Sequence, residues 1–115
     1  MSLERISAEA ALSQLGNFSE VIDARSEGEY AEDHLPGAVN WPSLHDEERK
    51  IVGTRYKQIS QFEAKKLGAA LVAQNIATHI QRDVLDKPRE WQPLVYCWRG
   101  GKRSGSLALI LDQIG

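Results

Sequence analysis

The sequence predicts an α/β fold in which a small parallel β-sheet carries helices on both faces. Short apolar runs of strand length alternate along the chain with longer segments that show helical periodicity. This alternation is typical of βαβ units, which have parallel strands and right-handed crossovers. The 115 residues suffice for one domain, and a composition of 42% hydrophobic and 26% charged residues is ordinary for a globular protein.

The N-terminal part of the chain is expected to form a helix and then a strand. Ser7 is a good N-cap for a short helix over residues 8–15. Gly16 and Asn17 are expected to end that helix. Residues 19–23 contain adjacent Val and Ile and are expected to form a short buried strand.

A second helix and a second strand are expected next. Ser26 and Glu29 have the spacing of a capping box, in which each side chain accepts a backbone N–H bond of the other residue. Residues 38–40 are expected to form a short strand that ends at Pro42. The middle of the chain is polar and less regular, and only a helical turn over residues 45–50 is expected there.

The second half is expected to hold the longest helix, a strand and a final helix. Ser60 begins another capping box, and apolar residues recur after it on one helical face. Those apolar residues are Leu67, Leu71, Ile76 and Ile80. Residues 94–96 form a continuous apolar run, as expected for the most buried strand of a parallel sheet. Residues 103–114 are expected to form the final helix.

Cys97 directly follows that apolar run, and in parallel sheets ligands bind beyond the carboxyl ends of the strands. Paired glycines after it let the backbone curl its N–H groups inward as an anion nest. Nearby cations favour a thiolate, which is the nucleophilic form of cysteine. Cys97 is therefore the candidate catalytic residue. The candidate anion-binding loop consists of Trp98, Arg99, Gly100, Gly101, Lys102, Arg103 and Ser104.

Arg103 lies six positions after Cys97, which is also the spacing of cysteine-dependent phosphatases. The spacing by itself does not separate phosphate chemistry from sulfur or selenium chemistry. Trp98 suits either the core or a stacking surface beside the thiol. Asp23 and Arg25 end a strand beside the expected pocket, and an internal ion pair is favoured for them over substrate contact.

The three histidines have no spacing typical of a metal site, and the single cysteine adds no further ligand, so no metal is expected. A net charge of −2 gives no sign of a nucleic-acid-binding protein. No stretch approaches the roughly 18 apolar residues of a membrane span. Charged residues come too early at the N-terminus for a signal peptide, so a cytoplasmic location is expected.

Three segments, in the same order along the chain, resemble elements of the rhodanese superfamily. Asp23–Tyr30 resembles the Asp-x-Arg-x-x-x-Glu-Tyr element. His34–Pro42 resembles the His-Ile-Pro-Gly-Ala-x-Asn-x-Pro element. Tyr96–Ser104 resembles the active-site loop, although this loop is one residue longer than in many single-domain rhodaneses.

The longer loop is shared with a rhodanese-fold phosphatase group and with the tRNA 2-selenouridine synthases. Asp46–Gln58 resembles the Asp-Glu-Glu-Arg…Val-Gly-Thr-x-Tyr-Lys-Gln stretch of the synthases. The chain is therefore identified as similar to the rhodanese-like, N-terminal part of that family. Gly53, within this stretch, is expected to supply a turn.

The resemblance implies that the full enzyme replaces the sulfur of 2-thiouridine at the tRNA wobble position with selenium. Selenophosphate would be the co-substrate, no cofactor would be bound by this domain, and the family is also linked to geranylation. Cys97 matches the essential cysteine of the family. The resemblance also suggests tRNA contacts at Arg49, Arg55, Tyr56 and Lys57.

Three alternatives stay open: a sulfurtransferase with a Cys97 persulfide, a phosphatase with a Cys97 phosphoenzyme, and a non-catalytic binding module. Residues 1–115 are expected to be one domain that lacks its last strand–helix unit. The nucleotide-binding domain of the family is expected to follow it. The near-neutral charge predicts that the chain alone binds tRNA weakly, because much of the RNA-binding surface would lie elsewhere.

Overall fold

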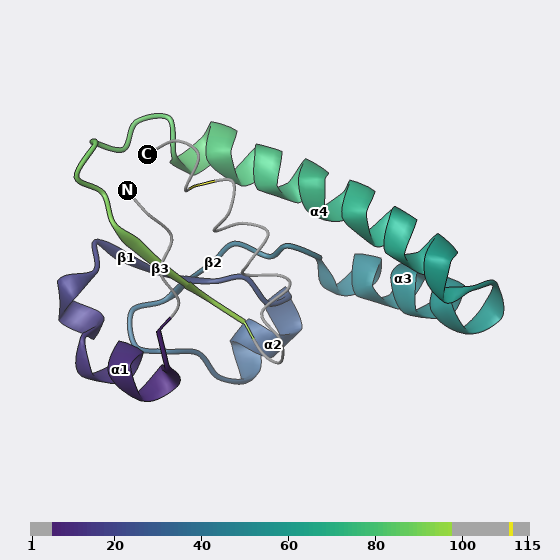
Figure 1. Cartoon of the computed structure of the whole chain (residues 1–115), viewed down its shortest axis with the longest axis horizontal. Coiled ribbons are helices and arrows are strands. Elements are labelled where there is room, and N and C mark those ends of the chain that lie inside the picture. The colour runs from purple at the N-terminus through teal and green to yellow at the C-terminus, as the bar shows by residue number, and fades with distance from the viewer. Residues whose placement is uncertain (1–5, 98–110, 112–115) are drawn as a thin grey trace.

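The computed structural model describes residues 6–97 and Leu111. A small parallel sheet with packed helices confirms the predicted α/β class (Figure 1). The elements in chain order are α1 (Ala8–Ser13), a 3₁₀ helix (Leu15–Asn17), β1 (Glu20–Asp23), α2 (Glu27–Glu32), β2 (Val39–Asn40), α3 (Asp46–Gln58), α4 (Gln61–Asp83) and β3 (Pro93–Tyr96).

The described strands form a parallel sheet in the order β2-β1-β3. Ile22 of β1 stands opposite Val39 on one side and Val95 on the other, and its side chain is fully buried. The expectation that residues 94–96 form the most buried strand was wrong. β3 is half-buried along its length, because β1 takes the central position among the described strands.

Helices lie on both faces of the sheet, with α1 and α2 on one side and α4 on the other (Figure 1). The apolar core between the sheet and α4 consists of Ile22, Ala24, Trp41, Ile76, Val84, Trp91 and Leu111. Leu111 is helical and 5% exposed. The rest of the final helix expected over residues 103–114 lies outside the described residues.

The first helix ends two residues earlier than expected. Ser7 Oγ accepts a hydrogen bond from Ala10 N at 3.1 Å, as its predicted role as N-cap requires. Helix α1 then ends at Ser13, and the chain continues as the tighter 3₁₀ helix Leu15–Asn17. Within the described residues, no helix is long and apolar enough to cross a membrane.

The polar middle of the chain is a full helix, so the helical turn expected over residues 45–50 is present but is only the start of a longer helix. Helix α3 runs from Asp46 to Gln58, with Gly53 in its interior rather than in a turn. Its N-terminus is capped where Glu48 Oε1 accepts a hydrogen bond from His45 N at 2.9 Å. Packing against the next helix, α4, completes its stabilisation, and a helix that depends on packing shows only a weak pattern in a polar sequence.

Helices α3 and α4 form a hairpin that extends away from the sheet along the longest, 44 Å axis of the molecule (Figure 1). Two buried side chains of α4 donate hydrogen bonds to the backbone of the segment that follows β2. Asn75 Nδ2 donates to Ser43 O at 2.9 Å and to Glu48 Oε1 at 2.7 Å. His79 Nε2 donates to Pro42 O at 2.8 Å.

His79 should make the stability of the domain depend on pH. Burial lowers its pKa, and its Nδ1 faces a guanidinium nitrogen of Arg82 at 3.4 Å. The unfolded chain therefore binds a proton at higher pH than the folded chain does. We expect the free energy of unfolding to fall as pH drops below about 6.5, the ordinary histidine value.

Urea unfolding between pH 7.5 and pH 5 measures this dependence. In His79→Gln the pH slope should be shallower than in the parent chain. The exposed His34 provides a matched control, because His34→Gln should keep the parent slope. Equal slopes for His79→Gln and the parent would show that another group causes the loss.

Candidate functional site

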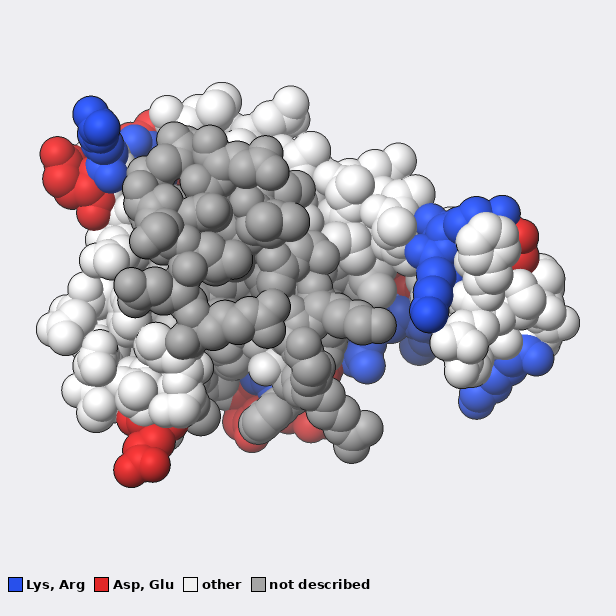
Figure 2. Space-filling model, in the orientation of Figure 1, with Lys and Arg blue, Asp and Glu red and all other residues white. Residues whose placement is uncertain are grey.

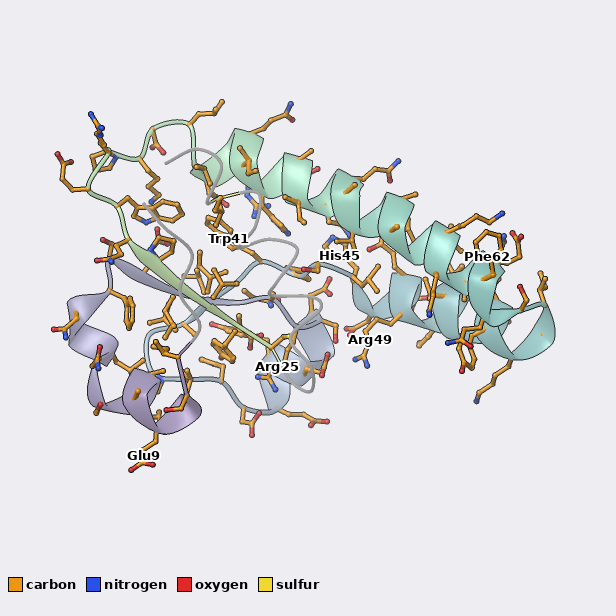
Figure 3. The ribbon with its side chains drawn as sticks, viewed as in Figure 1. Glu9, Arg25, Trp41, His45, Arg49 and Phe62 are labelled. Atoms are coloured by element: carbon orange, nitrogen blue, oxygen red, sulfur yellow. The ribbon has the colours of Figure 1, made fainter. Side chains whose placement is uncertain are left out.

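The carboxyl ends of β1 and β3 lie side by side, with Asp23 paired in register with Tyr96. Cys97 follows immediately and is half-buried, in contact with the edge of the apolar core. The candidate nucleophile is therefore at the sheet edge where ligands bind in parallel α/β folds. Figure 3 shows Arg25 at the same edge.

Asp23 and Arg25 form the internal ion pair that the sequence favoured. Arg25 Nη2 lies 2.8 Å from Asp23 Oδ2, and Arg25 Nε lies 3.1 Å from both carboxylate oxygens. The backbone N–H of Arg25 also donates to Asp23 Oδ1 at 2.8 Å. The side chains are 2% and 0% exposed, and the hydrogen bonds to Asp23 are the main cause of the raised Arg25 pKa.

Tyr96 joins this ion pair to the residue that precedes Cys97. Its hydroxyl donates to Asp23 Oδ2 at 3.1 Å and accepts from Leu35 N at 3.0 Å. Burial is the main cause of its raised pKa, so the hydroxyl keeps its proton for the bond to Asp23. Sequence reasoning missed this role, although a tyrosine that ends an apolar strand indicates a buried hydroxyl in need of a partner.

Asn40 is a second residue that sequence reasoning missed. Its amide Nδ2 donates to Asp23 O at 3.1 Å and to Arg25 O at 2.8 Å. These bonds hold the end of β2 against the chain as it leaves β1. Helix α2 then begins at the predicted capping box of Ser26 and Glu29. The edge beside Cys97 is therefore fixed by buried polar contacts.

The candidate anion-binding loop, Trp98 to Ser104, lies outside the described residues. The roles of its three cations and paired glycines in binding an anion therefore stay predictions. The described residues include β3 and Cys97, which directly precede this segment in the sequence.

The acidic start of α3 is tied to the start of α2. The Asp46 carboxylate accepts from Gly28 N at 3.0 and 3.1 Å, and Glu27 Oε1 accepts from Asp46 N at 3.2 Å. Each helix thus supplies a carboxylate to the N-terminus of the other. The second Glu27 oxygen lies 2.7 Å from His45 Nδ1, and contacts with His45 and backbone N–H groups hold the pKa of Glu27 down against the raising effect of burial.

The suggested tRNA contacts fall in two places. Arg49 Nη1 pairs with Glu29 Oε1 at 2.7 Å, so its guanidinium lies against α2 near the sheet. Arg55, Tyr56 and Lys57 lie in the last turn of α3, at the far end of the hairpin. Arg49 thus lies near the start of α3, and the other three residues lie at its end.

The described residues contain no group of three or more His, Cys, Asp and Glu side chains that could hold a metal ion. The three histidines have separate partners. His34 contacts Tyr30 O, His45 contacts Glu27, and His79 contacts Pro42 O.

Comparison with known proteins places this arrangement in a family. The family model described as the rhodanese-like domain matches residues 7–115. The chain belongs to the rhodanese-like family. The match covers the segment that contains Cys97 as well as the ion pair of Asp23 and Arg25, so the rhodanese-like domain here includes the whole candidate site.

Curated relatives of this rhodanese-like domain include several named tRNA 2-selenouridine synthase. The one from Chromohalobacter salexigens is 39% identical over 116 residues, which cover 100% of this chain and 31% of the relative. The one from Nitrosomonas europaea is 44% identical over 85 residues, which cover 73% of this chain and 22% of the relative. The chain thus spans less than a third of the length of either relative.

A solved structure has the same fold as this rhodanese-like domain. It is the crystal structure of the N-terminal domain of a protein described as an ATP/GTP binding protein, from Clostridium difficile 630. The two share 34% sequence identity with a TM-score of 0.71, over 97% of this chain and 85% of that chain.

Proposed function

We propose that this rhodanese-like domain is the chalcogen-transferring part of a tRNA 2-selenouridine synthase, with Cys97 as its nucleophile. The observation that carries the proposal is the similarity to synthases along the whole chain, at 38–39% identity. The position of Cys97, after β3 at the carboxyl edge of the sheet, supports a catalytic role.

The proposed reaction exchanges sulfur for selenium at the C2 carbon of 2-thiouridine in tRNA. The C–S bond of the thiouridine and the P–Se bond of selenophosphate break, and a C–Se bond forms. Both chalcogens stay at the −2 oxidation level, so the exchange needs no external oxidant or reductant. Water supplies the oxygen that completes phosphate, and the sulfur leaves as sulfide.

Each part of the site has a proposed task in this exchange. The thiolate of Cys97 attacks C2 of the thiouridine, so that an S–C2 bond forms and the original sulfur leaves as sulfide. Selenide, released from selenophosphate by water, then attacks C2, the C–Se bond forms, and the Cys97 thiolate leaves unchanged. The loop amides with Arg99 and Arg103 stabilise the anionic groups in these steps. Asp23 and Arg25 already pair with each other, so we assign them a structural role beside Cys97 rather than contact with the substrate. We propose cytoplasm as the location, since tRNA and selenophosphate are cytoplasmic substrates.

The test measures the conversion of 2-thiouridine to 2-selenouridine in an RNA stem-loop that carries 2-thiouridine at the wobble position. The stem-loop is incubated with selenophosphate and the protein, and its nucleosides are then separated by chromatography with mass detection. We expect 2-selenouridine with a protein in which this chain replaces the matching segment of the Chromohalobacter salexigens synthase, and none with the same protein carrying Cys97→Ser. Asp33→Asn, an exposed change beside the pocket, is the control that should keep the activity.

Three outcomes would overturn the proposal in favour of a specific alternative. Thiosulfate-to-cyanide sulfur transfer without any RNA exchange would indicate a plain sulfurtransferase. Phosphate release from an aryl phosphate that is lost in Cys97→Ser would indicate a phosphatase. A Cys97 that is alkylated at neutral pH no faster than a peptide thiol, together with no turnover, would indicate a binding module.

A further inference from the structure

The α3–α4 hairpin ends in a surface that combines exposed apolar and cationic side chains. We define the hairpin tip as residues 55–66, which span the last turn of α3, the connection and the first turn of α4. Tyr56, Ile59 and Phe62 are 54%, 65% and 66% exposed. Figure 3 shows Phe62 at the end of the hairpin, well away from Arg25.

The hairpin tip is basic although the chain has a formal net charge of −2. The tip contains four cationic residues and one carboxylate, Glu63. Figure 2 shows Lys and Arg side chains gathered at this end of the molecule. Lys66 pairs with Glu63 at 2.9 Å and lies 4.6 Å from the centre of the Phe62 ring. The other cations of the tip are Arg55, Lys57 and Lys65.

We propose that the hairpin tip is an RNA-binding surface, whose cations contact phosphates and whose aromatic rings of Tyr56 and Phe62 stack on unpaired bases. Phosphate is the charge complement of this surface, and aromatic side chains between cations are the usual platform for single-stranded bases. A protein partner fits less well, because lysine is depleted in protein interfaces. Naming tRNA as the RNA rests on the proposed function.

The distance between the tip and the sheet supports a large ligand. Val72 is the first residue of α4 that packs against the apolar core, and Cys97 packs against the same core. Phe62 precedes Val72 by ten residues, so a rise of 1.5 Å per residue places Phe62 about 15 Å farther along the helix. A selenophosphate-sized molecule at Cys97 cannot reach the tip, whereas a folded RNA can contact both.

This surface differs from the set of contacts that the resemblance suggested. It leaves out Arg49, which is paired with Glu29 near the sheet. It adds Phe62 and Lys65, which belong to the first turns of the next helix. The tip therefore holds the RNA at a place distinct from the reacting atoms, and its residues are binding residues rather than catalytic ones.

Filter binding of unmodified tRNA to the 115-residue chain, from about 20 to 200 mM salt, tests the proposal, because phosphate contacts weaken steeply with salt. We expect Phe62→Ala to weaken binding about tenfold at low salt, as loss of one stacked base does. Lys57→Gln with Lys65→Gln should lower the slope of log affinity against log salt by about 1.5.

Two exposed residues of the segment that follows α4 provide matched controls. Leu85→Ala removes an apolar side chain that is 77% exposed, and Arg89→Gln removes an exposed cation. Both should leave affinity and salt slope unchanged. The inference is overturned if the tip variants bind tRNA like the parent chain, or if the tip variants abolish a self-association of the chain and leave RNA binding intact.

Cys97→Ser separates this inference from the proposed function. If the tip binds RNA and Cys97→Ser keeps that binding while no selenium exchange occurs in any protein, the proposed function fails and the RNA-binding surface stands. If exchange occurs and needs Cys97 but the tip variants bind tRNA normally, the proposed function stands and the hairpin inference fails.

Discussion

Replacing Asp23 with Ala should lower the free energy of unfolding by about 3–5 kcal/mol, because the change removes the buried carboxylate that makes the closest ion pair with the Arg25 guanidinium. Arg25 is 2% exposed and makes its closest side-chain ion pair, at 2.8 Å, with Asp23. The change also removes the acceptor of the Tyr96 hydroxyl. Urea unfolding monitored by circular dichroism measures the loss.

Asp33→Ala is the matched control for this prediction. Asp33 Oδ1 lies 3.5 Å from the same guanidinium, but its side chain is 76% exposed. Removing an exposed partner should cost less than about 1 kcal/mol. If Asp23→Ala proved as mild as Asp33→Ala, the ion pair would not be holding the edge beside Cys97. The double change Asp23→Ala with Arg25→Met should recover part of the loss, because it also removes the buried charge that Asp23 had neutralised.

Replacing Trp41 with Ala should lower the free energy of unfolding by about 3–5 kcal/mol, the usual effect of removing a large buried aromatic side chain. Trp41 is 4% exposed and stacks against the rings of His79 and Trp91, at centroid distances of 5.8 and 6.1 Å. A loss of this size is a large fraction of the roughly 5–15 kcal/mol that stabilises a typical domain. Thermal unfolding should therefore begin well below the parent transition.

Phe62→Ala provides the comparison at the surface. It also deletes an aromatic side chain, but from a residue that is 66% exposed. A change of no more than about 0.5 kcal/mol is expected there. Trp41→Phe should fall between the two, because it keeps a ring in the core. Equal effects of Trp41→Ala and Phe62→Ala would contradict the assignment of Trp41 to the centre of the core.

Strands and caps were predictable where a local pattern specifies them. The capping box at Ser26 appears in full, because its bonds form between residues three apart. Of the capping box predicted at Ser60, the structure gives the hydrogen bond that Ser60 Oγ accepts from Glu63 N. Helix α3 was underestimated because its stability comes from contacts with α4 and from the carboxylates exchanged with α2. Contacts of α3 with other elements stabilise it without requiring a strong apolar periodicity in its own sequence.

The candidate site was predictable in the same uneven way. The place of Cys97 after an apolar run could be inferred, because parallel strands bring their carboxyl ends to one edge. The ion pair of Asp23 and Arg25 could also be predicted, because the two residues have opposite charges and lie at the end of a strand. The links from Tyr96 to Asp23 and from Asn40 to Arg25 were not, because they depend on the register between strands.

The pairing of β1 with β3 also bears on the order in which the chain folds. Glu20 pairs with Pro93 and Asp23 with Tyr96, so this contact closes a loop that contains both helices of the hairpin. Contacts between residues far apart in sequence are the slow ones to form, whereas the neighbouring helices α3 and α4 can associate locally. An early hairpin would shorten the effective length of that loop. We therefore expect the edge that carries Cys97 to be completed only in the last stage of folding.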